Sequence, residues 1–181
     1  MSVNTEHEPR VARIDPSDAD PAVRESFDNF VRVRGKVPNL FRISARRPQI
    51  GRTLAMHLDA VMGPGEVEQQ LKELLAVRVS QLNRCDYCLA SHGMLAKRYG
   101  ASDAQIAALS RGDTTAFEPA WRAALEAAGE ATSGGGRLGD DTFDRLAAGW
   151  SPAQLVEIVA VIGLFNYFNR FANALDIPVT K

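Results

Sequence analysis

Helix start and stop signals recur along this chain, and they constrain its fold more than any other feature. Asp20 followed by Pro21 is typical of a helix N-terminus, and Gly35 is typical of the end of that helix. No stretch alternates apolar and polar residues as a half-buried strand does. The sequence therefore predicts an all-α fold, a compact multi-helix domain. We expect a short helix after 102 and longer helices over 21–34, 48–62, 66–83, 85–99, 119–131 and 152–175.

Size and charge narrow the classes of function. The 181 residues suffice for one domain that buries roughly 70% of its unfolded surface. We expect a mobile segment over 1–19 and a single domain over 20–181. A net charge of -1 lacks the basic excess that nucleic acid binding requires. The longest apolar run, 158–165, is shorter than the about 20 residues that span a bilayer. Residues 1–20 contain no apolar stretch typical of a signal peptide, so we expect a cytoplasmic protein without a membrane span.

The C-terminal helical segment is apolar on nearly its whole circumference. A surface helix of a monomer would not keep such a surface, so this segment is either the central helix or half of a subunit interface. We expect a closed homo-oligomer. Asn166, Asn169 and Asn173 lie on one face of the same segment. Because buried amides need partners, a structural network that links subunits is favoured over a direct role with substrate.

Four chemistry-bearing residues, Glu73, Cys85, Cys88 and His92, fall within two adjoining helical segments. The cysteines are three residues apart, so at the start of a helix they are neighbours and can reach disulfide distance. His92 follows Cys88 by four residues, which places the imidazole one turn further along the same face. A base beside a thiol makes a nucleophile, and a helix N-terminus also favours the thiolate. Glu73 belongs to the preceding, mostly apolar helix, where it needs a partner such as this histidine.

The cysteine pair alone leaves several interpretations open. A CxxC in a reducing compartment can be inert core, half of a zinc site or a redox pair. Structural zinc sites usually combine a CxxC with a second, distant Cys or His pair, which this chain lacks. We therefore expect no metal and no cofactor. A thioredoxin-like site is excluded because no strand is predicted before Cys85. The combination with Glu73 and His92 favours a chemically active site over inert core.

The segment from Glu73 to His92 resembles the signature E-x11-CxxC-x3-H of the alkylhydroperoxidase D-like proteins, within the carboxymuconolactone decarboxylase superfamily. Segments 37–41 and 166–173 are similar to the flanking segments of peroxidase-related members. The resemblance implies an all-α fold, assembly into a homotrimer or homohexamer, and thiol-dependent reduction of peroxides. It also implies that Cys88 is the peroxidatic thiol, that Cys85 is the resolving thiol, and that His92 with Glu73 forms the proton relay that activates Cys88.

We therefore expect an oxidoreductase that reduces organic hydroperoxides and is itself reduced by a thiol, which in the resembling enzyme belongs to a lipoylated carrier protein. Tyr87 departs from the founding peroxidase, which has a histidine immediately before its second cysteine. The decarboxylase branch typically lacks the cysteine pair, which argues against lactone decarboxylation. Two alternatives stay open. One is a lactone decarboxylase that uses Glu73 and His92 as acid and base, and the other is a non-enzymatic interaction protein that senses oxidants through its CxxC.

Overall fold

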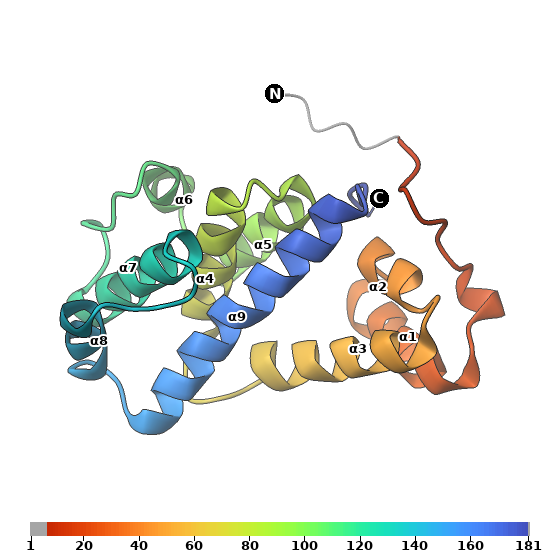
Figure 1. Cartoon of the computed structure of the whole chain (residues 1–181), viewed down its shortest axis with the longest axis horizontal. Coiled ribbons are helices and arrows are strands. Elements are labelled where there is room, and N and C mark those ends of the chain that lie inside the picture. Colours follow the sequence, from red (N-terminus) through yellow and green to blue (C-terminus); the bar gives the residue numbers. More distant parts are fainter. Residues whose placement is uncertain (1–6, 181) are drawn as a thin grey trace. The chain divides into compact units, whose positions relative to one another are not determined.

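The computed structural model describes residues 7–180, and this part of the chain consists of helices and loops without a strand (Figure 1). The prediction of an all-α fold is therefore confirmed. A short 3-10 helix, η1 (Pro16–Asp18), comes first. The α-helices follow in the order α1 (Pro21–Arg34), α2 (Asn39–Ser44), α3 (Pro48–Met62), α4 (Gln69–Leu82), α5 (Asp86–Arg98), α6 (Asp103–Ser110), α7 (Pro119–Ser133), α8 (Asp140–Ala147) and α9 (Pro152–Ala174).

The ends of the longer helices coincide with the local signals in the sequence. Asp20 caps α1 because its side chain accepts a hydrogen bond from the Ala22 backbone N–H. Gly35 ends α1 with a φ of 73°, a left-handed conformation that glycine adopts without steric cost. At the start of α6, Ser102 and Gln105 form both hydrogen bonds of a capping box. Local capping hydrogen bonds and backbone conformation thus set these helix boundaries.

Helices α2 and α8 were not predicted, and α4 begins later than expected. Both missed helices are short, with 6 and 8 residues, so each offers only about two turns in which a helical pattern could be recognised. The start of α4 is shifted because the loop before it has a tertiary partner. The carboxylate of Glu157 in α9 accepts hydrogen bonds from the backbone N–H groups of Glu66 and Val67, 2.9 and 3.2 Å away. These hydrogen bonds attach the loop before α4 to α9.

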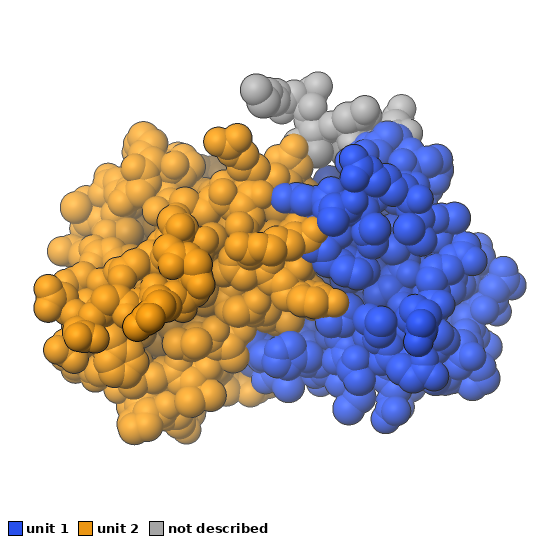
Figure 2. Space-filling view, viewed as in Figure 1, with its two compact units in different colours: residues 1–63, 171–181 blue, residues 64–170 orange. Residues whose placement is uncertain are grey.

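The chain forms two compact units, coloured separately in Figure 2. Unit 1 comprises residues 1–63 and 171–181, and unit 2 comprises residues 64–170. The single domain expected over 20–181 and the mobility expected over 1–19 stay predictions. Residues 1–6 of that segment lie outside the described residues, whereas its remainder includes η1.

Unit 1 contains α1, α2 and α3 together with the C-terminal segment. Its core includes Phe30 of α1 and Phe41 of α2, whose ring centroids are 4.3 Å apart. The segment before α1 is held by backbone hydrogen bonds, since the N–H of Ile14 donates to the carbonyl of Arg42 at 3.0 Å. Unit 1 is thus a small helical layer with both ends of the described chain attached to it.

Unit 2 is built around α4, which contacts α5, α6 and α7. Leu71, Leu74 and Leu75 are completely buried, as expected of a mostly apolar helix. The burial is so extensive that two charged residues of α4, Lys72 and Glu73, are also removed from solvent. A buried charge needs a partner. Lys72 forms an ion pair with Glu157 of α9, and this pair ties the central helix to the C-terminal one.

Helix α9 has one buried and one exposed face. Ile158 and Phe165 are completely buried within the protein, whereas Val156, Val159 and Tyr167 are exposed. Among residues 7–180, α9 is the one helix long and apolar enough, by length and composition, to cross a bilayer. The core helix of a water-soluble protein has the same properties. Because the apolar side chains of its inner face pack inside the protein, α9 does not indicate a membrane span.

We predict that Lys72→Met destabilises the protein by about 1.5–3 kcal/mol at neutral pH, because it leaves the Glu157 carboxylate without its charged partner. Burial alone would raise the pKa of Glu157. Hydrogen bonds from Lys72 and from the backbone N–H groups of Glu66 and Val67 outweigh burial and lower this pKa. A lowered carboxyl pKa stabilises the fold above the unfolded-state pKa, and this contribution is lost as the pH falls through the folded-state value.

Urea unfolding at neutral pH and below about pH 4 checks this expectation, because an unperturbed glutamate titrates near there. Wild type should lose more stability on acidification than Lys72→Met. Equal losses in the two proteins would show that the ion pair contributes nothing to the acid sensitivity.

Candidate active site

The turn between α4 and α5 places the cysteine pair. Arg84 has a φ of 52°, and around it the backbone closes two hydrogen bonds. The N–H of Cys85 donates to the carbonyl of Ser80 at 3.0 Å, and the N–H of Arg84 donates to that of Gln81 at 3.2 Å. This is a Schellman motif with arginine at the left-handed position that usually holds glycine. The turn is tight enough for Cys85 to become the N-cap residue of α5, with Cys88 in the first turn of that helix.

Glu73 and His92 form the polar link between α4 and α5. Oε2 of Glu73 lies 2.6 Å from Nδ1 of His92, and both residues are buried. The second carboxylate oxygen accepts a hydrogen bond from Nε2 of Gln69 at 3.2 Å. Both oxygens of the buried carboxylate are therefore satisfied. The structure brings these two residues together as the sequence predicted.

The partner of His92 also fixes the orientation of its ring. An ionised carboxylate only accepts hydrogen bonds, so Nδ1 of His92 carries the proton of this bond, and in the neutral ring Nε2 keeps a lone pair. Phe165 of α9 packs against the imidazole in an edge arrangement, with ring centroids 4.5 Å apart and an interplanar angle of 80°. An imidazole held in this way can accept a proton at Nε2 while Glu73 stabilises the imidazolium.

Both cysteines are buried and neither forms a disulfide in this structure. The two side chains are hydrogen-bonded to each other, and this shared bond separates their acidities. It lowers the pKa of Cys85, with the backbone N–H of Cys88 acting in the same direction against the effect of burial. The same bond and then burial raise the pKa of Cys88 well above its ordinary value. Cys88 is therefore the weaker acid of the two, and a base would promote its deprotonation.

Asn169 of α9 completes the surroundings of the sulfurs. Its side chain is completely buried, and its Nδ2 donates to Oγ of Ser80 at 3.0 Å. Nδ2 of Asn83 donates to Oδ1 of both Asn166 and Asn169 at 3.0 Å. These partners lie within one chain, so this part of the asparagine network connects helices rather than subunits. Asn173 is exposed.

Sequence reasoning found Asn169 through its spacing on an apolar helix, but it missed Ser80, Asn83 and Phe165. Serine and asparagine are common at helix ends, and phenylalanine is common in cores, so none of them carries a signal in isolation. Their place in the site depends on how α9 packs against α4 and α5. Only the run of asparagines on α9 indicated that some polar feature had to face this helix.

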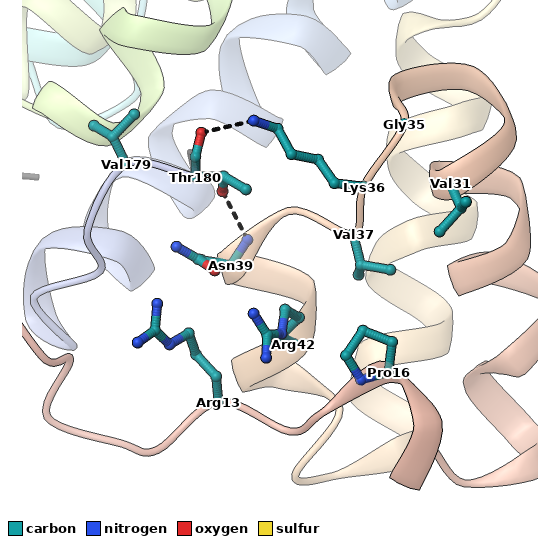
Figure 3. A pocket seen from close by; sticks show the side chains of 10 residues that line it. All are labelled: Arg13, Pro16, Val31, Gly35, Lys36, Val37, Asn39, Arg42, Val179 and Thr180. Carbon is teal, nitrogen blue, oxygen red and sulfur yellow. Dashed lines mark hydrogen bonds between the residues drawn. The ribbon is translucent and has the colours of Figure 1, made fainter. Parts of the chain in front are cut away.

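A cavity of about 410 Å³ lies in unit 1 (Figure 3). The cysteine pair belongs to unit 2. The lining of the cavity includes the cations Arg13, Lys36 and Arg42. Arg13 pairs with Glu8, and the other two donate hydrogen bonds to backbone carbonyls. The charges around this cavity are thus engaged within the protein. Among residues 7–180, no group of three or more His, Cys, Asp or Glu side chains is arranged to hold a metal ion.

Comparison with known proteins identifies relatives of this arrangement. Residues 48–130 match the Carboxymuconolactone decarboxylase family. Over 109 residues the chain is 34% identical to the uncharacterized protein YnjA of Escherichia coli (strain K12), and the match covers 60% of each protein. The chain thus spans about three fifths of the length of that relative.

Two solved structures share the fold. The first is a peroxidase-related protein from Ralstonia eutropha JMP134, described as an alkylhydroperoxidase AhpD core. It superposes with a TM-score of 0.85 at 22% identity, over 97% of this chain and 94% of that one. The second is the debrominase Bmp8 in complex with 2,3,4-tribromopyrrole, with a TM-score of 0.81 at 23% identity, over 94% of this chain and 91% of that one. Identities this low show a common fold and nothing further.

The hydrogen bond between the thiols predicts that removing either cysteine shifts the pKa of the other, and that the two shifts have opposite directions. Cys85→Ala should lower the pKa of Cys88, because that bond is the largest cause of its raised value, while burial keeps it above ordinary. Cys88→Ala should raise the pKa of Cys85, because the main stabiliser of its thiolate is lost. The ultraviolet absorbance of the thiolate, followed against pH in each single-cysteine protein, measures both values. Shifts in the same direction would contradict the shared proton.

Proposed function

We propose that this chain is an alkylhydroperoxidase D-like, thiol-dependent peroxidase that reduces organic hydroperoxides, because residues 48–130 match the Carboxymuconolactone decarboxylase family and the fold is shared with peroxidase-related proteins. The observation that carries the proposal is the buried hydrogen bond between Glu73 of α4 and His92 of α5, with a reduced CxxC at the start of the same helix α5. The substrate would be a small-molecule hydroperoxide. The need for reduced thiols fits a cytoplasmic location, because that compartment keeps cysteines reduced.

The first step would use Cys88 as the peroxidatic thiol. Its raised pKa means that a base has to remove the proton, and Nε2 of His92 is the available base, with Glu73 stabilising the imidazolium. The thiolate attacks the terminal peroxide oxygen, the O–O bond breaks, and the alkoxide leaves. The alkoxide takes the proton from His92, which gives the alcohol and a sulfenic acid on Cys88.

The second step would close the disulfide. The thiolate of Cys85 attacks the Cys88 sulfur, the S–O bond breaks, and the hydroxyl leaves with a proton as water. Cys85 is suited to this role because it is the N-cap residue of the helix whose first turn contains Cys88, so the two side chains are neighbours. An external dithiol then reduces the disulfide by thiol–disulfide exchange. Since both sulfurs are buried, we propose a reductant on a flexible arm, such as the lipoyl group of a carrier protein.

A second candidate is reductive debromination of an aromatic ring. The likeness to the debrominase Bmp8 favours it, because that protein was solved with a brominated pyrrole. The reaction balances with the same thiols, since an aryl bromide and two thiols give the arene, hydrogen bromide and the disulfide. Parallel assays with a dithiol, one with 2,3,4-tribromopyrrole and one with an alkyl hydroperoxide, decide which compound is the substrate. Release of bromide identifies debromination.

We predict that Cys88→Ser abolishes peroxide reduction, whereas Cys85→Ser allows one round of oxidation that stops at a sulfenic acid. The reason is that Cys88 attacks the peroxide and Cys85 only resolves the product. Mass spectrometry after dimedone trapping locates the sulfenic acid. A sulfenic acid on Cys85 of Cys88→Ser, formed at the wild-type rate, would reverse the assignment. A lactone decarboxylase would keep its activity in both variants, and a sensor would form the disulfide without turning over.

We also predict that His92→Ala and Glu73→Gln each slow the reaction of Cys88 with hydroperoxide by roughly 10²–10⁴. His92→Ala removes the base, and Glu73→Gln removes the charge that stabilises the imidazolium. Rapid-mixing measurement of thiol loss gives the rate, and circular dichroism provides the control for folding. Either variant reacting as fast as wild type near neutral pH would exclude the relay.

For assembly, we propose a homotrimer or homohexamer in which the exposed face of α9 is buried. Val156, Val159, Gly163 and Tyr167 form one stripe along this helix, because their spacing returns to the same side of an α-helix. An exposed apolar stripe of this kind is typical of an interface. The stripe excludes Phe165, which is buried within the chain.

Val159→Glu should therefore dissociate the oligomer, because it puts a charge into the interface. Met94→Glu is the matched control, since Met94 is an exposed apolar residue on α5 outside the stripe. Light scattering at micromolar concentration measures the mass of each protein. A monomeric wild-type protein, or an unchanged mass in Val159→Glu, would show that α9 does not form the interface.

A further inference from the structure

The cavity of unit 1 combines cations with apolar walls (Figure 3). Its volume of about 410 Å³ lies within the range of small-molecule sites in proteins, roughly 300–1,000 Å³. Arg13, Lys36 and Arg42 line it, and no Asp or Glu of the described residues is part of the lining. The apolar part of the wall consists of Pro16, Val31, Val37 and Val179. Such a lining suits a ligand that carries negative charge on an apolar body.

Hydrogen bonds within unit 1 hold the walls of this cavity in place. The N–H of Asn39, the first residue of α2, donates to Oγ1 of Thr180 at 2.9 Å, and its Nδ2 donates to the carbonyl of Pro178 at 3.0 Å. The N–H of Ile14 donates to the carbonyl of Arg42 at 3.0 Å, and Nε of Arg42 donates to the carbonyl of Ile14 at 2.9 Å. Helix α2 thus binds both the N-terminal and the C-terminal wall, so the cavity is preformed.

Arg42 presents the donors that an anion needs. Its Nε is used by Ile14, whereas Nη1 and Nη2 have no hydrogen-bond partner among residues 7–180. The two η nitrogens of a guanidinium bind a carboxylate through two parallel hydrogen bonds. Since Nε is already held, the guanidinium is oriented before any ligand arrives, and less side-chain entropy is lost on binding. Arg42 is also half-buried, which reduces the competition from water.

Arg13 and Lys36 add further positive charge to the same cavity. The Arg13 side chain is 26% exposed, and both of its contacts with Glu8 use Nη2, so Nε and Nη1 remain available as donors. Lys36 donates to the carbonyl of Thr180 at 3.2 Å, which uses one of its three N–H groups. Figure 3 shows the Arg13 side chain extending toward Asn39, with Arg42 beside them. Each cation therefore has one partner within the protein and further N–H groups for a ligand.

The acidic side chains that act on these cations do not cancel their charge. Glu8 pairs with Arg13, and the charge of Asp15 interacts with that of Arg42. Neither carboxylate lines the cavity, and Asp15 accepts the capping hydrogen bond of η1. With Lys36 included, the cations around the cavity outnumber these acids, so its charge favours an anion.

We propose that this cavity binds a small organic carboxylate, with the carboxylate on the η nitrogens of Arg42 and the apolar body against the valines of the wall. Arg13 and Lys36 strengthen the attraction for the negative charge. The lining residues all belong to unit 1, and none lies in the helical hairpin that contains the cysteines. The proposal is therefore independent of the thiol chemistry and of the identity of the oxidant.

The test is calorimetric titration of the full chain at low ionic strength with three probes. Hexanoate has both a carboxylate and an apolar body, hexanol has only the apolar body, and inorganic phosphate has only the charge. We expect hexanoate to bind saturably and more tightly than either of the other probes. Added salt should weaken its binding, because salt screens the attraction between the charges.

Arg42→Gln should weaken hexanoate binding by about tenfold or more, as the loss of hydrogen bonds to a charged group requires. Arg46→Gln is the matched control. Nε of Arg46 donates to the carbonyl of Ala12 at 2.9 Å, just as Nε of Arg42 does to Ile14, but Arg46 does not line the cavity. Hexanoate binding should therefore be unchanged in Arg46→Gln. This pair of variants separates contact with the ligand from loosening of the N-terminal segment.

Lys36→Gln provides a second variant if Arg42→Gln does not fold, because Lys36 is exposed and its removal leaves the core intact. It should weaken hexanoate binding by about two- to fivefold, as expected for an exposed charge. The absence of saturable hexanoate binding, or equal affinity for hexanol or phosphate, would overturn the proposal. An equal loss of binding in Arg46→Gln and Arg42→Gln would also overturn it, as would unchanged binding in Lys36→Gln.

Discussion

The hydrogen bond between Glu73 and His92 determines how α5 lies against α4. A carboxylate in this buried position is stable only if both of its oxygens have partners, and Gln69 and His92 provide them. Since His92 is one turn beyond Cys88, fixing the imidazole also fixes the first turn of α5. The position of the cysteine pair therefore depends on this hydrogen bond together with the tight turn between α4 and α5. A few residues therefore suffice to fix the positions of the reactive side chains.

Much of this site could be predicted from the sequence because it is local. Glu73, Cys85, Cys88 and His92 belong to one helical hairpin, and helical periodicity alone brings them together. The order of the thiol acidities could not be predicted. Helix position and the neighbouring histidine argued for a thiolate at Cys88, yet the bond between the thiols favours the thiolate of Cys85. That outcome depends on the direction of a single S–H, which spacing does not reveal.

The fold was predictable where backbone signals are strong and less so where tertiary contacts decide. Pro48 and Met62 bound α3 as expected, whereas the start of α4 depends on a carboxylate that arrives from α9. Glu157 is an acidic residue in an apolar helix. It forms an ion pair with Lys72 and accepts a hydrogen bond from the loop before α4. Helix α9 thus contributes charge and amide groups on its inner side and an apolar stripe on its outer side. Composition alone could not separate these two faces.

Ser80 and Asn169 are 89 residues apart in the chain, although their side chains meet. A ribosome therefore completes α4 and α5, with both cysteines, well before it adds the helix that brings the amide. Until α9 docks, the buried hydroxyl of Ser80 lacks its amide partner, so the packing around the turn that holds the cysteines is completed only when α9 has been synthesised.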